Sequence, residues 1–308
     1  LKANILFAYL NACLELNQPD NNLFSEYLKL PRQAIYANNE FYQKTNLNNA
    51  YIQFDKTFPS INNTHQIQSD LKLIETYLFL LIKSSANMSE YQMYFDKSYF
   101  NKFEAESKIK TGLGKPDEFY NVLGANDLEN LKNSVEISFT EQNPKFHLTS
   151  EKIKLSLQIK NVNELEIQVY KLNMLDFYRS NNKEIEQNIS LEGYIPNISK
   201  KISYQKPSYI RHEEQIDLAE ITEPGVYIIE LLGNGIKTRT FIRKGNIFPA
   251  IYESNSGHEI QLFDDSQNQI VDFTVYFGQH ELKSDSRGIV ILPYADEKNQ
   301  GEKVLVFS

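Results

Sequence analysis

The sequence is poor in the residues and runs that most often mark a disulfide-linked, membrane-spanning or nucleic-acid-binding protein. A single cysteine among 308 residues excludes an intrachain disulfide. Tryptophan is absent, so 19 tyrosines and 19 phenylalanines supply the large aromatic side chains. The most apolar run, residues 77–82, is far shorter than the roughly 18 residues of a membrane span. A net charge of −8 argues against a general nucleic-acid binder, which would carry a basic face.

What remains is the composition of an ordinary globular protein, with a hydrophobic fraction of 41%. The length allows two or three domains. The chain begins at Leu1 without methionine or a signal-type leader, and it ends directly after an apolar stretch, residues 304–307. We therefore expect a fragment of a larger protein, in which residues 304–307 pair within their own module and the natural polypeptide continues past Ser308.

The clearest structural signal is a β-hairpin in residues 223–245. Asn234-Gly235 is a residue pair that a type I′ turn favours, because both central positions of that turn need a positive φ. This turn sets a register in which strands 226–232 and 236–242 pair and Glu230 faces Arg239. The face predicted to enter a core carries Tyr227, Ile229 and Leu231.

Residues 1–132 are predicted to form an α-helical domain, because apolar side chains recur there at helical spacing. Pro19 ends the first helix, Ser69 is a suitable N-cap for the second, and a short helix is expected to begin near Asn126. Residues 44–66 are rich in asparagine and are expected to be mostly loop. The apolar faces are Leu6, Tyr9, Leu10, Cys13 and Leu16 in the first helix, Leu71, Ile74, Leu78 and Leu81 in the second, and Tyr91, Tyr94, Phe95, Tyr99 and Phe103 in an aromatic-rich third.

After residue 132 the apolar pattern changes to alternation, which is typical of half-buried antiparallel strands. Together with the hairpin, and with weaker strands near Ile202 and at residues 215–218, these segments predict a β-sandwich over residues 133–245. The alternating faces are Val135, Ile137 and Phe139; Ile153, Leu155, Leu157 and Ile159; and Leu165, Ile167 and Val169.

A second β module is predicted over residues 246–308, and the polar cluster 264–268 supplies the turn between its first strands. With about five strands it has fewer than the roughly seven of a closed sandwich, so we expect it to be incomplete. The predicted fold is therefore α+β and multidomain: an N-terminal α-helical region, residues 1–132, followed by two antiparallel β-sandwich modules. The expected strands of the second module are 258–263, 270–277, 288–294 and 304–307.

Several strand and turn segments carry a resemblance to a known family. They are residues 159–173, 224–227, 233–235, 239–245 and the acidic turn, glycine and strand of 284–293. With these segments, residues 134–308 resemble the macroglobulin domains of alpha-2-macroglobulin-like proteins, particularly the large bacterial and protist members. The last segment is also similar to transthyretin-like sandwiches. The resemblance implies a scaffold part of a large protein.

None of the family's functional residues carries over to this chain. The family's reactive thioester lies in a Gly-Cys-Gly-Glu-Gln motif, and Cys13, in Asn-Ala-Cys-Leu-Glu, does not match it. No protease-bait segment can be assigned either. As partners, the resemblance implies other domains of a longer parent chain, and proteases or surface proteins; it implies an extracellular or cell-surface location. The single cysteine and the missing signal peptide leave an intracellular location open.

Two polar clusters invite a chemical interpretation. Gly233-Asn234-Gly235 matches part of a phosphate loop, but such a loop needs a helix after its glycines, and residues 236–242 are predicted to be a strand. A second cluster offers oxygen ligands for calcium, although the glycine and distal glutamate of an EF-hand are lacking, which favours a solvated turn. Its members are Asp264, Asp265, Asn268 and Asp272.

The remaining candidates are single residues. Cys13 lies on an apolar helix face, which favours a buried thiol over a nucleophile. The basic strand face around Arg239 is partly neutralised if Glu230 pairs with it, which favours a solvated face over a binding patch. Lys237 and Arg243 belong to the same basic face, and the five histidines are scattered: His65, His147, His212, His258 and His280. Four Asn-x-Ser/Thr sequons occur, at Asn62, Asn87, Asn188 and Asn197, and chance explains that number in an asparagine-rich chain.

We therefore predict a non-enzymatic scaffold and interaction segment, with no catalytic, cofactor-binding or metal-binding residue assigned and with protein binding or protease trapping as its role. The alternative is a carbohydrate- or surface-binding module of an adhesin-like protein, suggested by the abundant tyrosine and phenylalanine. A hydrolase with a cleft in the helical domain is the third interpretation, supported only by scattered carboxylates.

Overall fold

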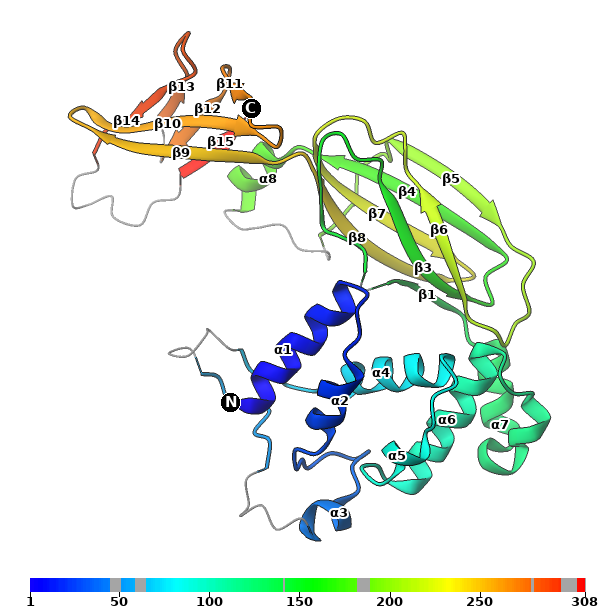
Figure 1. Cartoon of the computed structure of the whole chain (residues 1–308). Helices are drawn as coiled ribbons and strands as arrows, with labels where there is room; N and C mark the ends of the chain where they lie inside the picture. The colour runs from blue at the N-terminus through cyan, green and yellow to red at the C-terminus, as the bar shows by residue number, and fades with distance from the viewer. Residues whose placement is uncertain are drawn as a thin grey trace.

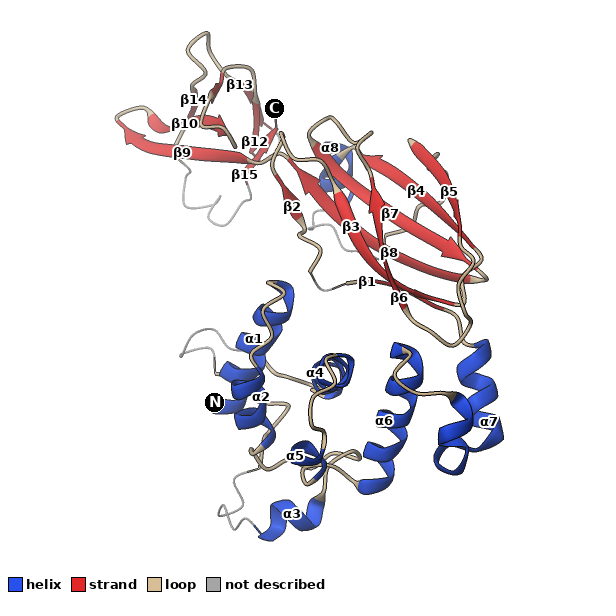
Figure 2. Cartoon of the chain, turned by 45° about the vertical axis from the view of Figure 1, so that its right-hand side comes forward, coloured by secondary structure: helices blue, strands red, loops and turns tan. Residues whose placement is uncertain are grey.

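A computed structural model describes residues 1–44, 51–58, 65–140, 142–181, 189–277, 280–294 and 304–307. A helical region, a β-sandwich and a second, smaller β unit follow one another along the chain (Figure 1). Helices make up the first unit and strands the other two, apart from one helix, α8 (Met174–Asn181), that lies among the strands (Figure 2). The predicted fold class is therefore confirmed, because the change of apolar period near residue 132 coincides with the change from helix to strand.

The helical region is organised around one aromatic-rich core. Phe24 and Tyr77, both completely buried, stack with their ring centroids 4.5 Å apart. Leu10 from α1, and Ile74 and Leu78 from the same helix as Tyr77, fill the same core. The elements of this region are α1 (Lys2–Glu15), α2 (Asn21–Leu28), α3 (Asn39–Lys44), α4 (Leu71–Lys83), α5 (Ser89–Gln92), α6 (Lys97–Thr111), the 3₁₀ helix η1 (Pro116–Phe119) and α7 (Tyr120–Asn133).

The predicted inner face of α1 is only partly right. Leu6, Leu10 and Cys13 are buried as expected, but Tyr9 and Leu16 are 49% and 70% exposed. The buried stripe continues instead through Ala3 and Leu14, which lie three residues before Leu6 and four residues after Leu10, and Asn4 is buried beside Ala3. Tyr9 and Leu16 belong to a second apolar stripe, on the opposite side of the helix.

The predicted N-cap of α4 is also wrong. The helix begins at Leu71, and Asp70 rather than Ser69 occupies the cap position. The Asp70 side chain makes no cap hydrogen bond, because its carboxylate is engaged by buried groups from the preceding segments. Apolar burial along α4 follows the prediction at Ile74, Leu78 and Leu81.

The expected third helix is two helices. The chain turns between α5 and α6, where Phe95 forms an isolated bridge with Ala37 and Asp96 caps α6 by accepting a hydrogen bond from Tyr99 N. The label α7 covers two helices joined across a kink at Gly124, whose φ is 74°, and the short helix expected to begin near Asn126 is the second of them. Within the predicted loop 44–66, residues 45–50 and 59–64 lie outside the described residues.

The first sandwich packs a three-stranded sheet, in the order β1-β3-β6, against a five-stranded sheet, β2-β8-β7-β4-β5. All pairs are antiparallel except β2 with β8. The predicted inward residues, such as Leu155, Leu165 and Ile167, are completely buried between the two sheets. The strands are β1 (Glu136–Phe139), β2 (Phe146–His147), β3 (Lys154–Lys160), β4 (Glu164–Leu172), β5 (Ile198–Ser203), β6 (His212–Asp217), β7 (Gly225–Gly233) and β8 (Ile236–Lys244).

The hairpin prediction is confirmed in register and turn. β7 and β8 pair with Glu230 opposite Arg239, and Asn234 and Gly235 have φ values of 44° and 81°. The predicted core face, which includes Tyr227 and Ile229, is buried. The other face of β7 is buried as well, because α8 and the segment at Leu191 cover it through contacts with Ile228 and its neighbours. That second cover was not predicted.

The second β unit has more strands than expected. β10 pairs along its length with β9, and on its other side with β11 and β14; a second layer has the order β13-β12-β15. The last strand pairs with β12, as predicted. The predicted strand 270–277 is two strands, and those at 247–254 and 280–283 were missed. The strands are β9 (Ile247–Ser254), β10 (Gly257–Asp264), β11 (Gln269–Ile270), β12 (Thr274–Phe277), β13 (His280–Lys283), β14 (Val290–Leu292) and β15 (Val304–Phe307).

Charged residues join the helical region to the first sandwich. Glu136, on β1, is 2.8 Å from Lys110 of α6, and it accepts hydrogen bonds from Arg211, which precedes β6. The guanidinium of Arg211 also lies 4.9 Å from the ring centroid of Phe79 on α4. These two basic neighbours lower the pKa of Glu136 against the opposing effect of its burial. The junction is thus ionic at neutral pH.

Candidate interaction surfaces

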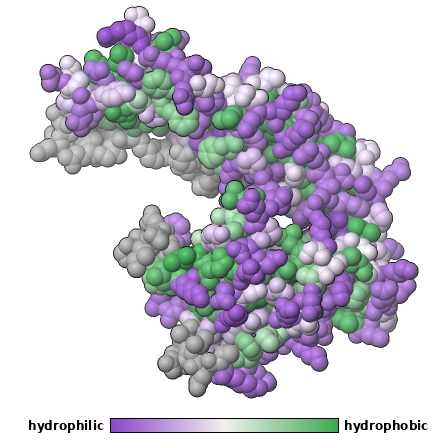
Figure 3. Space-filling view, viewed as in Figure 1, coloured by the Kyte–Doolittle hydropathy of each residue, from purple (hydrophilic) through white to green (hydrophobic). Residues whose placement is uncertain are grey.

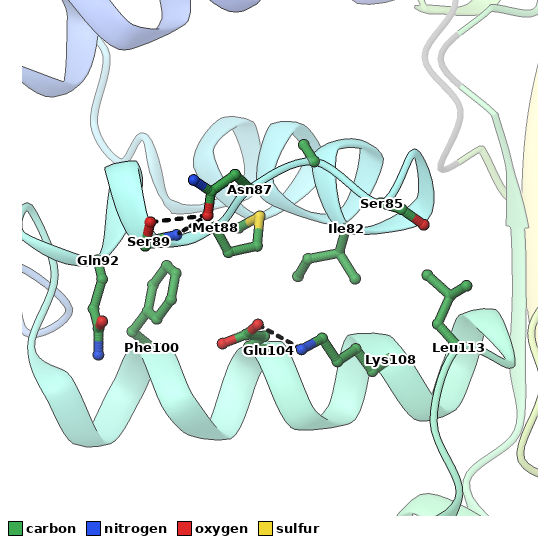
Figure 4. A pocket seen from close by; sticks show the side chains of 11 residues that line it. Ile82, Ser85, Asn87, Met88, Ser89, Gln92, Phe100, Glu104, Lys108 and Leu113 are labelled. Atoms are coloured by element: carbon green, nitrogen blue, oxygen red, sulfur yellow. Dashed lines mark hydrogen bonds and ion pairs between the residues drawn. The ribbon is translucent and has the colours of Figure 1, made fainter.

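A groove of about 530 Å³ runs between α6 on one side and the end of α4 with α5 on the other (Figure 4). Ile82 and Phe100, both 2% exposed, form its floor and point into it from the two sides. Met88 adds to this floor, and Leu113, which is half-exposed, closes one end. An apolar floor of this kind can receive a side chain from another molecule.

The rim of the groove is polar and internally paired. Asn87 accepts hydrogen bonds from the backbone N–H and the hydroxyl of Ser89, at 3.2 and 2.8 Å. Glu104 and Lys108, one turn apart on α6, form an ion pair at 2.8 Å. The ionisable residues of the rim, Glu104 and Lys108, are thus paired with each other, and the groove combines an apolar floor with a polar rim.

A buried ion pair supports the helical region at the start of α4. Arg32 and Asp70 are completely or almost completely buried, and their Nη1 and Oδ2 atoms are 2.8 Å apart. Asp70 also accepts hydrogen bonds from the hydroxyls of Tyr27 and Tyr36. Burial is the largest cause of the raised pKa of both tyrosines, and the neighbouring carboxylate adds to it. The cluster is saturated by its own members, so its role is to hold α2 and the start of α4 together.

The outer face of α1 is apolar and exposed. Ile5 and Tyr9 are 41% and 49% exposed, and Leu16 is more exposed still. Ala8 and Ala12 are exposed between them. Hydrophobic side chains gather on this helix in the space-filling view (Figure 3). Sequence reasoning placed Tyr9 and Leu16 on the inner face, although their spacing to Ile5 and Ala12 was the signal of a second stripe.

The structure places Asp264, Asp265 and Asn268 at the turn between β10 and β11, and Asp272 in the segment between β11 and β12. Asp264 accepts hydrogen bonds from the backbone of Ser266 and Asn268, at 2.9 and 2.8 Å, and these bonds lower the pKa of its carboxyl group. Asp265 points elsewhere and accepts a hydrogen bond from Thr149 N in the first sandwich. Among the described residues, no three His, Cys, Asp or Glu side chains converge as metal ligands would.

The other sequence candidates are dispersed. Cys13 is buried, as its position on α1 predicted. The histidines lie on separate elements, with His147 buried at the end of β2. Gly233-Asn234-Gly235 is the hairpin turn, as expected. Asn87 lies at the groove and Asn197 before β5, whereas Asn62 and Asn188 lie outside the described residues.

The basic strand face is largely neutralised. Glu230 is almost fully buried and lies 2.9 Å from Lys237, and it accepts a hydrogen bond from Arg239, which confirms the predicted pair. Arg239 also donates to the backbone carbonyl of Ile189, at 2.8 Å. The guanidinium of Arg243 lies 5.8 Å from the ring centroid of Phe146. The positive charges of Lys237 and Arg239 are therefore offset by the carboxylate of Glu230.

Sequence comparison relates two segments of the chain to an N-terminal domain and an immunoglobulin-like domain of one class of actin-binding protein. Residues 1–135 match the family described as "Actin-binding protein F N-terminal domain", and residues 165–245 match "AbpF first immunoglobulin-like domain". The first match covers the helical region, and the second covers most of the first sandwich.

One particular relative is similar along nearly the whole chain. "Actin-binding protein F" from Dictyostelium discoideum is 26% identical over an alignment of 308 residues that covers 99% of this chain and 13% of that protein. The chain therefore corresponds to a small part of the length of the relative. No helix within the described residues has both the length and the apolar character to cross a membrane.

Among solved structures, two of native alpha-2-macroglobulin from Escherichia coli are similar over 56% of this chain. The one spanning domains MG0-NIE-MG1 is 12% identical over 63% of its length, with a TM-score of 0.35. The one spanning NIE-MG1 is 13% identical over 96% of its length, with a TM-score of 0.34. Likenesses this weak carry no argument about what the chain does. Protease trapping and an extracellular location, which were expected from the macroglobulin resemblance, thus receive no support.

Proposed function

We propose that this chain is a non-enzymatic binding and scaffold segment of a protein related to actin-binding protein F, and that it contributes to contact with actin inside the cell. The observation that carries the proposal is the order of the two family matches, which follows the order of the structural units. Actin as the partner is taken from the name of the relative, which aligns with 99% of the chain. We propose residues 1–132, 133–245 and 246–308 as its domains.

Within this proposal the groove beside α6 is the contact surface. It combines a buried apolar floor, formed by Ile82 and Phe100, with a polar rim, which is the usual anatomy of a protein–protein contact. The first sandwich then serves as a rigid support, because Glu136 ties it to α6 through Lys110. Neither the rim nor the floor supports a hydrolase, since the ionisable residues of the rim, Glu104 and Lys108, pair with each other.

Co-sedimentation of the 308-residue chain with actin filaments tests this function. We expect saturable binding that Leu113→Glu weakens by about tenfold, because a charge at the end of the groove would meet an apolar partner group. Val122→Glu is the matched control: Val122 is exposed to nearly the same degree on α7, outside the groove, and its substitution is expected to leave binding unchanged. Failure of the unmodified chain to bind filaments would refute the proposed function, and equal effects of the two variants would refute the groove as its site.

A further inference from the structure

The second apolar stripe of α1 has a geometry that calls for a partner. A helix packed against a core on one side normally carries polar residues on the other. Here the outward positions hold Ile5, Ala8, Tyr9, Ala12 and Leu16, all exposed. They recur every three or four residues, which is the spacing at which one helix packs against another. A contiguous apolar patch of this kind on a protein surface marks an interaction site.

The stripe is complementary to itself when two copies are placed antiparallel. With the two helices centred between Leu10 and Asn11, Ile5 of one copy faces Leu16 of the other, and Tyr9 faces Ala12. The ring of each Tyr9 then meets the methyl group of Ala12 in the other copy, and an Ile5–Leu16 pair lies at each end of the interface. Because the arrangement has twofold symmetry, every favourable contact occurs twice, as in other isologous interfaces. Asn11 does not oppose the pairing, since its side-chain amide already donates to Phe7 O at 2.8 Å.

The charges that border the stripe favour the same arrangement. Lys2, whose Nζ atom lies 3.9 Å from Glu26 on α2, is at one end of α1 and Glu15 is at the other, and all three side chains are in contact with solvent. Antiparallel pairing brings Lys2 of each copy within about one helical turn of Glu15 of the other, whereas parallel pairing would place like charges side by side. The two charges cancel, although the whole chain carries a net charge of −8. The stripe itself carries no charge. A second copy of the chain, whose stripe is also uncharged, therefore suits this surface better than a strongly basic partner would.

We propose that the outer face of α1 is a self-association surface, through which two copies of this chain pair antiparallel about a twofold axis. A single helix of 14 residues from each copy gives a small interface, so the dimer forms at high protein concentration and dissociates on dilution. The proposal is independent of the proposed contact with actin, which was assigned to the groove beside α6.

Sedimentation analysis of the 308-residue chain tests the pairing. We expect the average mass to rise from 35.8 kDa toward twice that value between about 1 and about 500 µM. Ile5→Lys and Leu16→Glu, each alone, are expected to weaken dimerisation by at least about tenfold, because each places two unpaired charges in the apolar seam. An equal mixture of the two variants should dimerise again, since lysine at position 5 then faces glutamate at position 16 and the other end keeps its isoleucine–leucine pair.

The control is Ile35→Lys, the same chemical change at a residue that is 92% exposed in a loop of the same region, and it is expected to dimerise as the unmodified chain does. Helical circular dichroism of each variant confirms that the fold is retained. A chain that stays monomeric throughout the concentration range overturns the proposal. So does a mixture that fails to dimerise, which would indicate a parallel pair or another contact. Loss of filament binding by Leu16→Glu without a change in mass would assign the face to the filament instead.

Discussion

Lys160 Nζ, completely buried at the end of β3, donates a hydrogen bond of 2.7 Å to the backbone carbonyl of Ser134, the residue that follows α7. It also donates to the carbonyl of Leu131, and Asn161 adds bonds to the carbonyls of Lys132 and Asn133. The last carbonyls of α7 are thus satisfied by the first sandwich. A cation at this place also suits the negative end of the helix dipole. The helix end and the strand end therefore fix each other.

This arrangement predicts an unusual alkaline dependence of stability. Burial lowers the pKa of Lys160 from 10.5 to about 8. The folded protein therefore loses this proton at a lower pH than the unfolded chain does, and the free energy of unfolding should rise as the pH increases from 8 toward 10. We expect a gain of about 2 kcal/mol over this interval relative to Lys160→Met, which cannot titrate. Urea unfolding at several pH values measures it.

The two proteins are compared below pH 10, because the raised pKa values of tyrosines such as Tyr27 and Tyr36 act in the opposite direction above it. Parallel curves for the unmodified chain and Lys160→Met between pH 8 and 10 would show that the lysine titrates alike in the folded and unfolded states. That result would contradict a desolvated ammonium group at the junction between α7 and β3.

The second prediction concerns the buried pair of Arg32 and Asp70. Asp70→Asn leaves the guanidinium buried without a counter-charge, so we expect it to destabilise the helical region by about 3–5 kcal/mol. The double variant Arg32→Met/Asp70→Leu removes both charges and should recover part of this loss, but not all, because the hydroxyls of Tyr27 and Tyr36 lose their acceptor. Chemical unfolding followed by the helical circular dichroism signal measures both. A double variant less stable than Asp70→Asn would argue that the pair itself is strongly stabilising.

Local patterns determined which parts of the fold could be predicted. The register of β7 and β8 follows from one Asn-Gly turn, and the inward faces of β3 and β4 follow from strict alternation, so both were predictable from neighbours in sequence. The role of Asp70 could not be predicted in this way, because a polar residue before an apolar run indicates an N-cap. Only the tertiary contact with Arg32 shows that its carboxylate binds a guanidinium instead of capping the helix. The groove depends on α4 and α6 packing side by side, and no sequence spacing records that.

The third prediction concerns Gly257, at the start of β10. Its φ of 140° is a conformation that other residues rarely adopt, and a Cβ placed there would lie 2.3 Å from the carbonyl oxygen of Leu292 on β14. Since that atom belongs to the backbone of a paired strand, it cannot move without disturbing the sheet. We expect Gly257→Ala to destabilise the second β unit by about 3 kcal/mol.

Gly235→Ala separates the clash from the backbone conformation. Gly235 also has a positive φ, of 81°, but a Cβ there meets nothing within 4 Å. Its substitution should cost only about 1 kcal/mol, the penalty for a left-handed conformation alone. Thermal unfolding of the two variants gives the comparison, and equal losses would mean that β14 yields to the added methyl group.

The last prediction is a loss of stability in mild acid that originates at His147. This side chain is buried at the end of β2, and its Nε2 atom has no hydrogen-bond partner among the described residues. Its Nδ1 atom lies 3.5 Å from Glu151, and Lys244, on the neighbouring strand β8, is buried beside it with its ammonium donating to the Glu151 carbonyl at 2.6 Å. Burial lowers the pKa of His147, Lys244 lowers it further, and Glu151 opposes both.

Because the folded pKa of His147 lies below the ordinary value of 6.5, the folded protein binds this proton less readily than the unfolded chain. Its contribution to stability is complete above pH 6.5 and is lost as the pH falls through the folded pKa. We expect the melting temperature to fall less between about pH 7.5 and about pH 5.5 in His147→Phe than in the unmodified chain. Lys244→Met, which removes the facing cation, should reduce the acid loss in the same direction. If His147→Phe loses as much stability in acid as the unmodified chain does, protonation elsewhere governs the acid response.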